Sequence, residues 1–421
     1  MMQTTGPASA SGGMQVISGA RVVGPQELLE SADIVIQGDR IVEIVEHRDP
    51  ENWRSAGAQV TDAGGLYALP GMFDIHSDYI EHMAAPRPTS MMDFTLALRE
   101  TERELVGHGI TCMFHSLSLY KTTEFGDRPI RQPDNIKRFL EVIERSHQGH
   151  HIIRHRFHAR FEIDNLDRIA ELRTYIEQKR IHLLSFMDHT PGQGQYRDLE
   201  MFRKTLKGYR DLTDTEIDQI VEKHQSQEKI SLETIRELSN LAIENGISVA
   251  SHDDDTVEKV ALVKDFGTSI SEFPITIEVA RAAKEAGLFT IVGAPNVLLG
   301  GSHSGNLSAE DAILEGVAHI LCSDYYPAAM LHSIFQLHQK YPDRLSLSEL
   351  VRLVSLHPAQ AVGMGEDHGS IEVGKKADIF LVEMIPGFQA GEQAQSPAVR
   401  NVWIDGEPVY SAQYRQGEKH G

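Results

Sequence analysis

The chain has 421 residues, more than one ordinary domain holds, and 41% of them are hydrophobic, so it can bury a sizeable core. Its formal net charge of −21 repels nucleic-acid backbones and anionic membranes, so neither is expected as a partner. The charge does not exclude a small anionic substrate, because a binding site sets its own local charge.

The two cysteines, Cys112 and Cys322, provide no disulfide framework, which is typical of a cytoplasmic protein. Residues 1–13 are small and polar and are expected to form a disordered tail, without the apolar core of a secretory signal. No apolar run reaches the roughly 18 residues that a membrane span needs. We therefore expect a cytoplasmic protein, and the sequence is compatible with a homo-oligomer.

The two ends of the chain share one pattern, in which apolar and polar residues alternate in short runs. Residues 14–68 contain ADIVIQGDRIVEIV, where Gly38 and Asp39 separate two strand-like halves, and residues 369–421 contain similar runs. We predict that both ends together form a small β-sandwich domain. Residues 69–368 would then be inserted between them.

The inserted segment repeats a unit in which a buried strand is followed by an amphipathic helix, such as 93–109 or 274–287. Such a series is typical of an α/β fold, here a (β/α)8 TIM-like barrel. An extra helical excursion is expected near 198–246, which exceeds one crossover helix. The eight candidate strands are 69–76, 109–117, 156–163, 182–189, 248–254, 269–274, 290–295 and 319–324.

Most of these strands end in a histidine or a carboxylate, at the rim where the carboxyl ends of barrel strands converge. His76 and Asp78 are two residues apart and can therefore point the same way in an extended chain. Histidines and carboxylates gathered at one mouth suit Zn, Mn or Fe, so the pattern predicts a divalent metal site. The strand-end candidates are His76, Asp78, Glu162, Asp188, His189, His252, Glu272 and Asp324.

Single members of this set have other interpretations. Asp188 and Glu272 could each cap the following helix, and the acids of 252–255 could be a cap with solvated carboxylates. His115, after the second strand, could be a neutral hydrogen-bonded side chain. The accumulation of ligand types at one rim favours the metal site, because the acids would repel one another without a cation.

Two loops are candidates for substrate binding. Residues 293–306, GAPNVLLGGSHSGN, contain glycines that let backbone amides turn toward an anion, although a surface loop is the alternative. Prolines on both sides of Arg87 stiffen a second loop and would hold its guanidinium in place, or leave a surface arginine. The candidate contacts are Arg87, Asn296, Gly301 and His303.

Together, the split β-domain, LPGMFDIHSD and the late strand-end aspartate resemble the amidohydrolase superfamily. His76-Ser77-Asp78 departs from the usual His-x-His of that superfamily. The segments HARFE, SFMDHTPGQGQY, ASHDDDT and GGSHSGN resemble its PhnM-like branch, the α-D-ribose 1-methylphosphonate 5-triphosphate diphosphatases of phosphonate metabolism. This resemblance runs from about Met14 to Tyr410.

The resemblance implies a metal-dependent hydrolase that cleaves a ribose 5-triphosphate to the 5-phosphate and pyrophosphate. It implies a centre of two divalent ions, with Glu162 as the candidate bridge and Asp324 as the catalytic group that accepts the proton of the attacking water. The expected metal ligands are His76, Asp78, Glu162, His189, His252 and Asp324, and whether Asp188 or Glu272 replaces one of them is left open.

Two other functions stay open at this stage. The branch often carries a cation where this chain has His82, Gly194 and Leu299, so a divergent amidohydrolase that acts on an amide, a lactam or an amino-substituted ring is the first alternative. A non-catalytic binding subunit with the same fold is the second.

Overall fold

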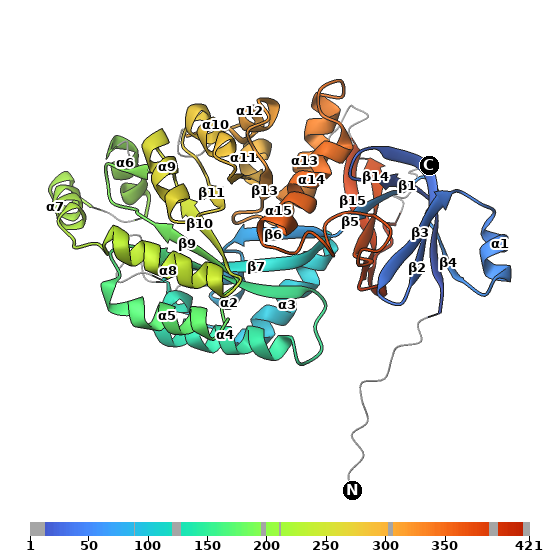
Figure 1. Ribbon diagram of the computed structural model, residues 1–421, viewed down its shortest axis with the longest axis horizontal. Coiled ribbons are helices and arrows are strands. Elements are labelled where there is room, and N and C mark those ends of the chain that lie inside the picture. Colours follow the sequence, from blue (N-terminus) through green and yellow to red (C-terminus); the bar gives the residue numbers. More distant parts are fainter. Residues whose placement is uncertain are drawn as a thin grey trace, which may run out of the picture.

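The computed structural model describes residues 13–87, 89–119, 128–194, 199–209, 212–301, 306–386 and 395–415. The predicted disordered tail, 1–13, lies outside these ranges except for its last residue. The described strands form two sheets of eight strands each, which lie side by side along the long axis of the molecule (Figure 1). Within the described ranges, no helix is both long enough and apolar enough to cross a membrane.

One sheet consists of parallel strands, each paired with the next strand in the sequence. An isolated parallel bridge between Ser77 and Asp324 joins the last strand to the first, so the sheet closes into a barrel. The predicted (β/α)8 fold is therefore confirmed. The strands are β6 (Met72–Ser77), β7 (Ile110–Leu119), β8 (Arg154–Glu162), β9 (Leu183–Met187), β10 (Ser248–His252), β11 (Ile270–Glu272), β12 (Phe289–Gly293) and β13 (Ile320–Cys322).

Helices connect successive barrel strands and cover the outside of the barrel (Figure 1). Several begin with a side-chain cap, for example Asp93 on α3 and Thr276 on α10. The helices of this region are α2 (Ile80–Ala84), α3 (Phe94–Gly107), α4 (Pro133–Ser146), α5 (Ile169–Glu177), α8 (Leu232–Glu244), α9 (Val257–Asp265), α10 (Ile277–Glu285), α11 (Ala294–Leu299), α12 (Ala309–Leu314), α13 (Ala329–Lys340), α14 (Leu347–Val354) and α15 (Leu356–Ala361), with short 3₁₀ turns at Pro129–Arg131 and Leu166–Arg168.

The barrel interior is apolar at the level of the middle of the strands and polar at their carboxyl ends. Its apolar cluster includes Phe73, Ile75, Leu183 and Ile270, all fully buried. In a strand, residues two apart lie on the same face. The inward-facing Ile270 of β11 is therefore followed on that face by Glu272, which lies in the mouth. The floor of the mouth is thus a packed layer that excludes water from below.

The first barrel strand contains an irregularity that matters for the mouth. Asp74 pairs with Met113, but Ser77 pairs with His115, so β6 carries an extra residue between these pairs. An extra residue in one strand re-aims the side chains that follow it. Ile75 can therefore join the apolar interior while the adjacent His76 contacts the groups of the mouth.

The seam between β6 and β13 is held by the buried side chain of Asp74. Its carboxylate accepts hydrogen bonds from the backbone N–H of Ser323 (3.2 Å), from the hydroxyl of Ser323 and from the N–H of His76 (3.4 Å). Burial raises the pKa of Asp74 to about 6, while the bonds from Ser323 oppose that effect. Asp74 thereby fixes the two strand ends that carry His76 and Asp324.

The second sheet is built from both ends of the chain, as the alternating patterns predicted. β5 pairs with β14, so the N-terminal and C-terminal strands are continuous in one sheet. The predicted domain limits, 14–68 with 369–421 and 69–368, stay a prediction. The strands are β1 (Gln15–Val23), β2 (Leu28–Gln37), β3 (Arg40–Glu46), β4 (Gln59–Asp62), β5 (Tyr67–Pro70), β14 (Ile379–Pro386), β15 (Gln395–Ile404) and β16 (Glu407–Ser411), and helix α1 (Pro50–Ser55) precedes β4.

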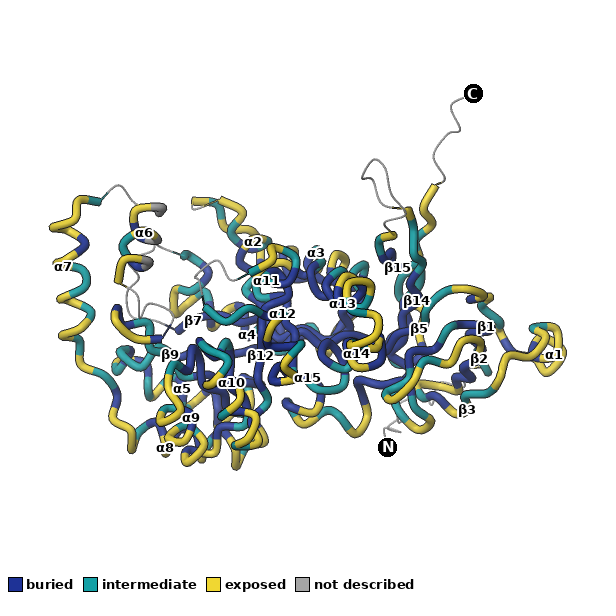
Figure 2. The backbone as a smooth tube through the Cα atoms, turned by 90° about the horizontal axis from the view of Figure 1, so that it is seen from above, coloured by how far each residue is buried: buried dark blue, intermediate teal, exposed yellow. Residues whose placement is uncertain are grey.

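The interval near 198–246 contains two helices in addition to α8. Helices α6 (Leu199–Tyr209) and α7 (Asp214–Gln225) bury Phe202, Leu206 and Ile217 against each other. Both views place this pair at the end of the molecule remote from the terminal sheet, and α7 is largely exposed (Figure 2). The pair is attached to the barrel rim where Gln225 donates a hydrogen bond to the carbonyl of Pro191 (3.0 Å).

Candidate metal centre

Histidines and carboxylates from five barrel strands meet at the carboxyl end of the barrel. β6, β10 and β11 end in or beside His76, His252 and Glu272, which offer ligand atoms that all lie within 4.8 Å of one another. The Nδ1 atom of His76 is 2.9 Å from Oε1 of Glu272. All three side chains are buried, so this group is shielded from solvent.

A second group shares His252 with the first. His189, His252 and Asp253 also offer ligand atoms within 4.8 Å of one another. Glu162, at the end of β8, binds His189 from the other side, with 2.6 Å between Oε1 and Nδ1. His252 is therefore the residue that joins the two groups.

Several polar atoms of these groups are buried with too few hydrogen-bond partners among the described residues. Oε2 of Glu272 has none at all, and Nδ1 of His252 and Oδ2 of Asp253, which lie 2.9 Å apart, have only each other. Burying such atoms without a partner is costly, and a cation satisfies imidazole nitrogen and carboxylate oxygen together. This arrangement fits a divalent ion of the Zn, Mn or Fe type.

The pKa values of two histidines decide how readily each ring can bind a metal ion. Burial lowers the pKa of His76 well below its ordinary value, so the ring is neutral and its nitrogens can act as ligands. Burial alone would lower the pKa of His189 as well, but the adjacent Glu162 carboxylate raises it. Metal binding at His189 would therefore compete with a proton.

His158 lies close to this cluster but is already bonded. Its Nδ1 lies 3.0 Å from the hydroxyl of Ser116, and its Nε2 bonds to the hydroxyl of Ser185. Burial lowers the pKa of His158 to about 3, so it is neutral. With both ring nitrogens occupied, His158 packs beneath His76, with 5.1 Å between ring centroids, and offers no free ligand atom.

Asp78 and Asp324 lie on the β6–β13 side of the mouth. The N–H of Asp78 donates to the carbonyl of Asp324 (2.8 Å), and the carboxylate of Asp78 is 3.5 Å from Arg131. Neither aspartate belongs to the two groups of three described above. Burial and the neighbouring Asp78 raise the pKa of Asp324 to about 7, so this carboxyl can take up and release a proton near neutral pH.

Three of the rim residues have left-handed backbone conformations. Asp253, Phe273 and Asp324 have φ values of 50°, 55° and 59°; the first two directly follow β10 and β11, and Asp324 lies two residues beyond the end of β13. This conformation costs on the order of 1 kcal/mol or more in residues other than glycine, and such strain is concentrated at functional sites. It turns the ring of Phe273 edge-on to His76, with 4.9 Å between ring centroids.

An ion pair between the half-buried Lys259 and the buried Asp254 stabilises the end of β10. The Nζ of Lys259 donates to the carbonyls of His252 (2.8 Å) and Asp253 (3.1 Å) and lies 3.4 Å from Asp254. Asp254 in turn accepts hydrogen bonds from the hydroxyls of Ser251 and Ser271. This network connects β10 to β11 and fixes the backbone that carries His252.

Comparisons with known proteins agree with this geometry. The profile of the amidohydrolase family matches residues 67–409 of the chain. The chain belongs to the amidohydrolase family. The resemblance inferred from the motifs is thereby confirmed.

Among curated amidohydrolases, the alpha-D-ribose 1-methylphosphonate 5-triphosphate diphosphatase of Escherichia coli (strain K12) is 31% identical over 378 residues, which cover 89% of this chain and 97% of that protein. The dihydroorotase of Streptococcus thermophilus (strain CNRZ 1066) is 39% identical over 69 residues, which cover 16% of this chain and 15% of that protein. Similarity to the diphosphatase thus extends over nearly the whole of both chains, whereas similarity to the dihydroorotase is local.

Solved structures show the amidohydrolase barrel as a whole. The N-acetylglucosamine-6-phosphate deacetylase of Pasteurella multocida gives a TM-score of 0.62 at 14% identity and covers 95% of this chain and 100% of that chain. The dihydropyrimidinase of Brevibacillus agri NCHU1002 gives 0.60 at 16% identity and covers 94% and 95%. At these identities the likeness concerns the fold.

Of the two carboxylates left undecided by the sequence, only Glu272 joins a metal-capable group of described residues in this amidohydrolase. Asp188 binds Lys229, with 2.8 Å between Oδ2 and Nζ, and accepts a bond from the N–H of Thr190. Burial would raise the pKa of Asp188, but the Lys229 ammonium lowers it. Asp188 therefore holds the turn after β9, and Glu272 is the stronger ligand candidate.

The predicted substrate contacts lie in different surroundings. Arg87 is exposed on the loop after α2. The side chain of Asn296 binds the backbone of Leu307 (3.3 Å) and of Ala309 (3.0 Å), and the N–H of Gly301 donates to the carbonyl of Asn296 (3.0 Å). Asn296 and Gly301 thus hold their own loop together. His303 lies outside the described residues.

The three positions without a family cation differ in how much room they offer. Gly194 has φ +50°, and a Cβ there would come within 3.2 Å of the Cβ of Asp253. An arginine at 194 would therefore strain both the backbone and the metal-capable Asp253. His82 and Leu299 are exposed and face no such restriction.

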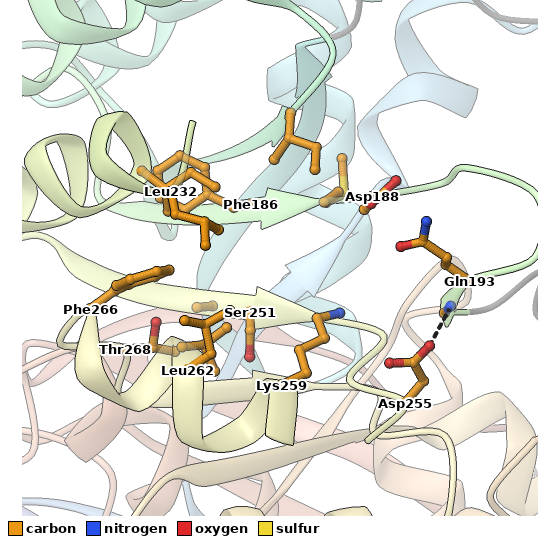
Figure 3. Close-up of a pocket in the computed structure, with 16 residues that line it drawn as sticks. Phe186, Asp188, Gln193, Leu232, Ser251, Asp255, Lys259, Leu262, Phe266 and Thr268 are labelled. Atoms are coloured by element: carbon orange, nitrogen blue, oxygen red, sulfur yellow. Dashed lines mark hydrogen bonds between the residues drawn. The ribbon is translucent and has the colours of Figure 1, made fainter. Parts of the chain in front are cut away.

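A cavity of about 270 Å³ lies beside the mouth, between β9, β10, α8 and α9 (Figure 3). It is apolar at one end and polar at the other, where the N–H of Gly194 donates to Asp255 (3.0 Å). The apolar end has Phe186, Leu232, Leu262 and Phe266, and the polar end has Asp188, Gln193, Asp255 and Lys259. The histidines of the metal-capable groups do not line this cavity, so it is separate from the metal centre.

Metal-free protein is expected to lose stability as the pH rises from about 4 to about 7. The folded-state pKa of Asp324 is raised from 3.8 to about 7, so the stability that its proton contributes is fully present below pH 3.8 and is lost as the pH passes through 7. Asp324→Asn removes this contribution. Melting temperatures of both metal-free proteins from pH 5 to 8 should therefore diverge, with wild type losing stability relative to the variant; parallel curves would contradict the raised pKa.

Proposed function

We propose that this amidohydrolase is a metal-dependent diphosphatase that cleaves α-D-ribose 1-methylphosphonate 5-triphosphate between its α and β phosphates. The products are the 5-phosphate and pyrophosphate. The observation that supports this substrate is the similarity to an enzyme of that name, which spans 89% of this chain and 97% of that protein. The strand-end cluster supplies groups of the type that phosphoryl hydrolysis needs.

The proposed metal ligands are His76, His189 and His252 together with the rim carboxylates. Glu162 lies beside His189 and Glu272 beside His76, so each histidine group contains an acid that balances metal charge. A pair of divalent ions held there would supply a hydroxide nucleophile at neutral pH and positive charge next to the phosphoryl oxygens. Asp78 and Asp253 are the remaining ligand candidates.

Asp324 is the proposed proton acceptor. Water that attacks the α phosphorus must lose a proton, and the oxygen that bridges the α and β phosphates leaves with pyrophosphate, taking the electron pair of the broken P–O bond. Because its pKa is raised to about 7, Asp324 can accept that proton and release it to the leaving oxygen. The anhydride bond is thereby replaced by one new P–O bond from water.

A second candidate function is hydrolysis of a less charged amide, lactam or amino-substituted ring. The observation that favours it is Gly194, whose tight approach to Asp253 leaves no room for the arginine that the branch often carries. Such an enzyme would release ammonia or an amine in place of pyrophosphate.

The test is to follow phosphorus NMR of the full-length, metal-loaded protein with the ribose triphosphate. Appearance of pyrophosphate and the 5-phosphate in equal amounts supports the proposal, and the same sample with ATP shows whether any triphosphate is accepted. No turnover in protein shown to contain metal contradicts it and directs the search to amide substrates. Absence of bound metal after loading would favour a non-catalytic binding protein.

A further inference from the structure

One cation lies inside the mouth and is not used by any part of the mechanism above. Arg160 is two residues before Glu162 on β8, so both side chains point to the same side of the strand, into the mouth. Its Nη2 is 3.4 Å from Nε2 of His252, and its Nε is 3.3 Å from the sulfur of Met187. Arg160 therefore reaches from the wall of the barrel to the residue shared by both metal-capable groups.

The guanidinium of Arg160 has no carboxylate within ion-pair distance among the described residues, although the mouth is rich in carboxylates. Other arginines of the barrel are paired: Arg131 at the mouth with Glu81 and Asp78, and Arg154 at the opposite end of β8 with Asp378 (2.9 Å) and Asp405 (2.6 Å). A thioether sulfur and an imidazole nitrogen are weak partners for a permanent cation. Within the part of the chain that the structure describes, no acidic group therefore neutralises Arg160.

The positive charge of Arg160 acts on residues from two other parts of the mouth. The positive charge of Arg160 interacts electrostatically with Asp324 and with His76. These residues lie on β6 and after β13, across the barrel from β8. A ligand that enters between the metal-capable groups and Asp324 is accordingly within reach of the guanidinium.

We infer that Arg160 binds an anionic group of the substrate, with its guanidinium donating two parallel hydrogen bonds to phosphoryl oxygens. The planar guanidinium matches two oxygens of one phosphate, which an ammonium does not. This inference rests on the proposed function and deepens it. It assigns to Arg160 the recognition of negative charge that the branch often places at positions 82, 194 and 299.

The experiment compares wild type with Arg160→Gln and Arg160→Lys, using pyrophosphate as the probe. Calorimetric titration of pyrophosphate is carried out on the metal-free and the metal-loaded proteins, and metal content is measured in each loaded sample. We expect Arg160→Gln to bind pyrophosphate about 10- to 100-fold more weakly, which is the loss in affinity that removal of a charge-assisted hydrogen bond causes. The metal content of the loaded variant should be unchanged. Arg160→Lys should recover part of the loss.

Arg236→Gln is the matched control, because Arg236 pairs with Asp265 on the outside of the barrel and should bind pyrophosphate like wild type. Equal pyrophosphate affinity in wild type and Arg160→Gln, in metal-free and loaded protein alike, would overturn the inference. If the triphosphate is not turned over but pyrophosphate binding still depends on Arg160, the proposed function fails and the anion site stands. If turnover occurs, KM should rise by the same factor in Arg160→Gln while kcat changes less.

Discussion

Replacement of Asp324 with asparagine is expected to lower kcat by roughly 10²- to 10⁴-fold, the usual contribution of a positioned acid–base group. Asparagine keeps the size of the side chain but cannot accept a proton. The raised pKa of Asp324, caused by burial and by Asp78, makes it suited to exchange a proton near pH 7. Steady-state kinetics with metal content measured on the same samples test the expectation.

The backbone of residue 324 needs its own control, since φ is +59° there. Asparagine tolerates that conformation almost as well as aspartate, so the variant should fold, and its melting temperature reports on this. Turnover within a few-fold of wild type at equal metal content would exclude Asp324 as the proton acceptor. Loss of metal together with activity would instead identify it as a ligand.

Replacement of His252 with alanine is expected to weaken metal binding by more than about 100-fold and to abolish turnover. Substitution of groups that merely orient a ligand usually costs 10- to 100-fold in affinity, and His252 belongs to both metal-capable groups. Removing it therefore takes one ligand atom from each. Equilibrium dialysis against a metal buffer measures the loss.

His182→Asn is the matched control for this variant. His182 is partly buried, and its Nδ1 accepts from the N–H of Phe157 (3.0 Å) just before β9, at the opposite end of the barrel from the mouth. Its substitution should leave metal affinity unchanged. Wild-type affinity in His252→Ala would rule out the metal centre that both groups define.

The fold could be predicted because most barrel strands are short apolar runs that end in polar residues, and because apolar and polar residues alternate in the terminal segments; β8, RHRFHARFE, is an exception to the first pattern. Helix starts were equally visible where a capping side chain is present, as at Thr276. The extra residue in β6 could not be predicted, since nothing in MFDIHS marks where the register with β7 shifts. Nor does sequence show that α6 and α7 pack against each other.

The site was only partly predictable, for a physical reason. Histidines at strand ends stand out because the rim gathers them, but whether a carboxylate faces a metal or caps a helix depends on backbone dihedrals. Asp253 joins a metal-capable group through a left-handed conformation that the run of aspartates does not reveal. Arg160 was missed because an arginine in a strand is usually solvated, and only the structure shows it without a carboxylate partner.

The sheet shared by the chain termini has a consequence for the order of folding. β7 and β8 can pair as soon as both are synthesised. β5 can pair early with β1 on one edge, but its other edge has to wait for β14, with Leu69 opposite Phe380. Contacts so distant in sequence are slow to form, and an unpaired strand edge stays exposed meanwhile. Pulse-labelled hydrogen exchange should therefore show β7 protected before the edge of β5 that faces β14. A chain whose synthesis stops before β14 would then have a closed barrel, but the edge of β5 that normally pairs with β14 would stay open and could aggregate.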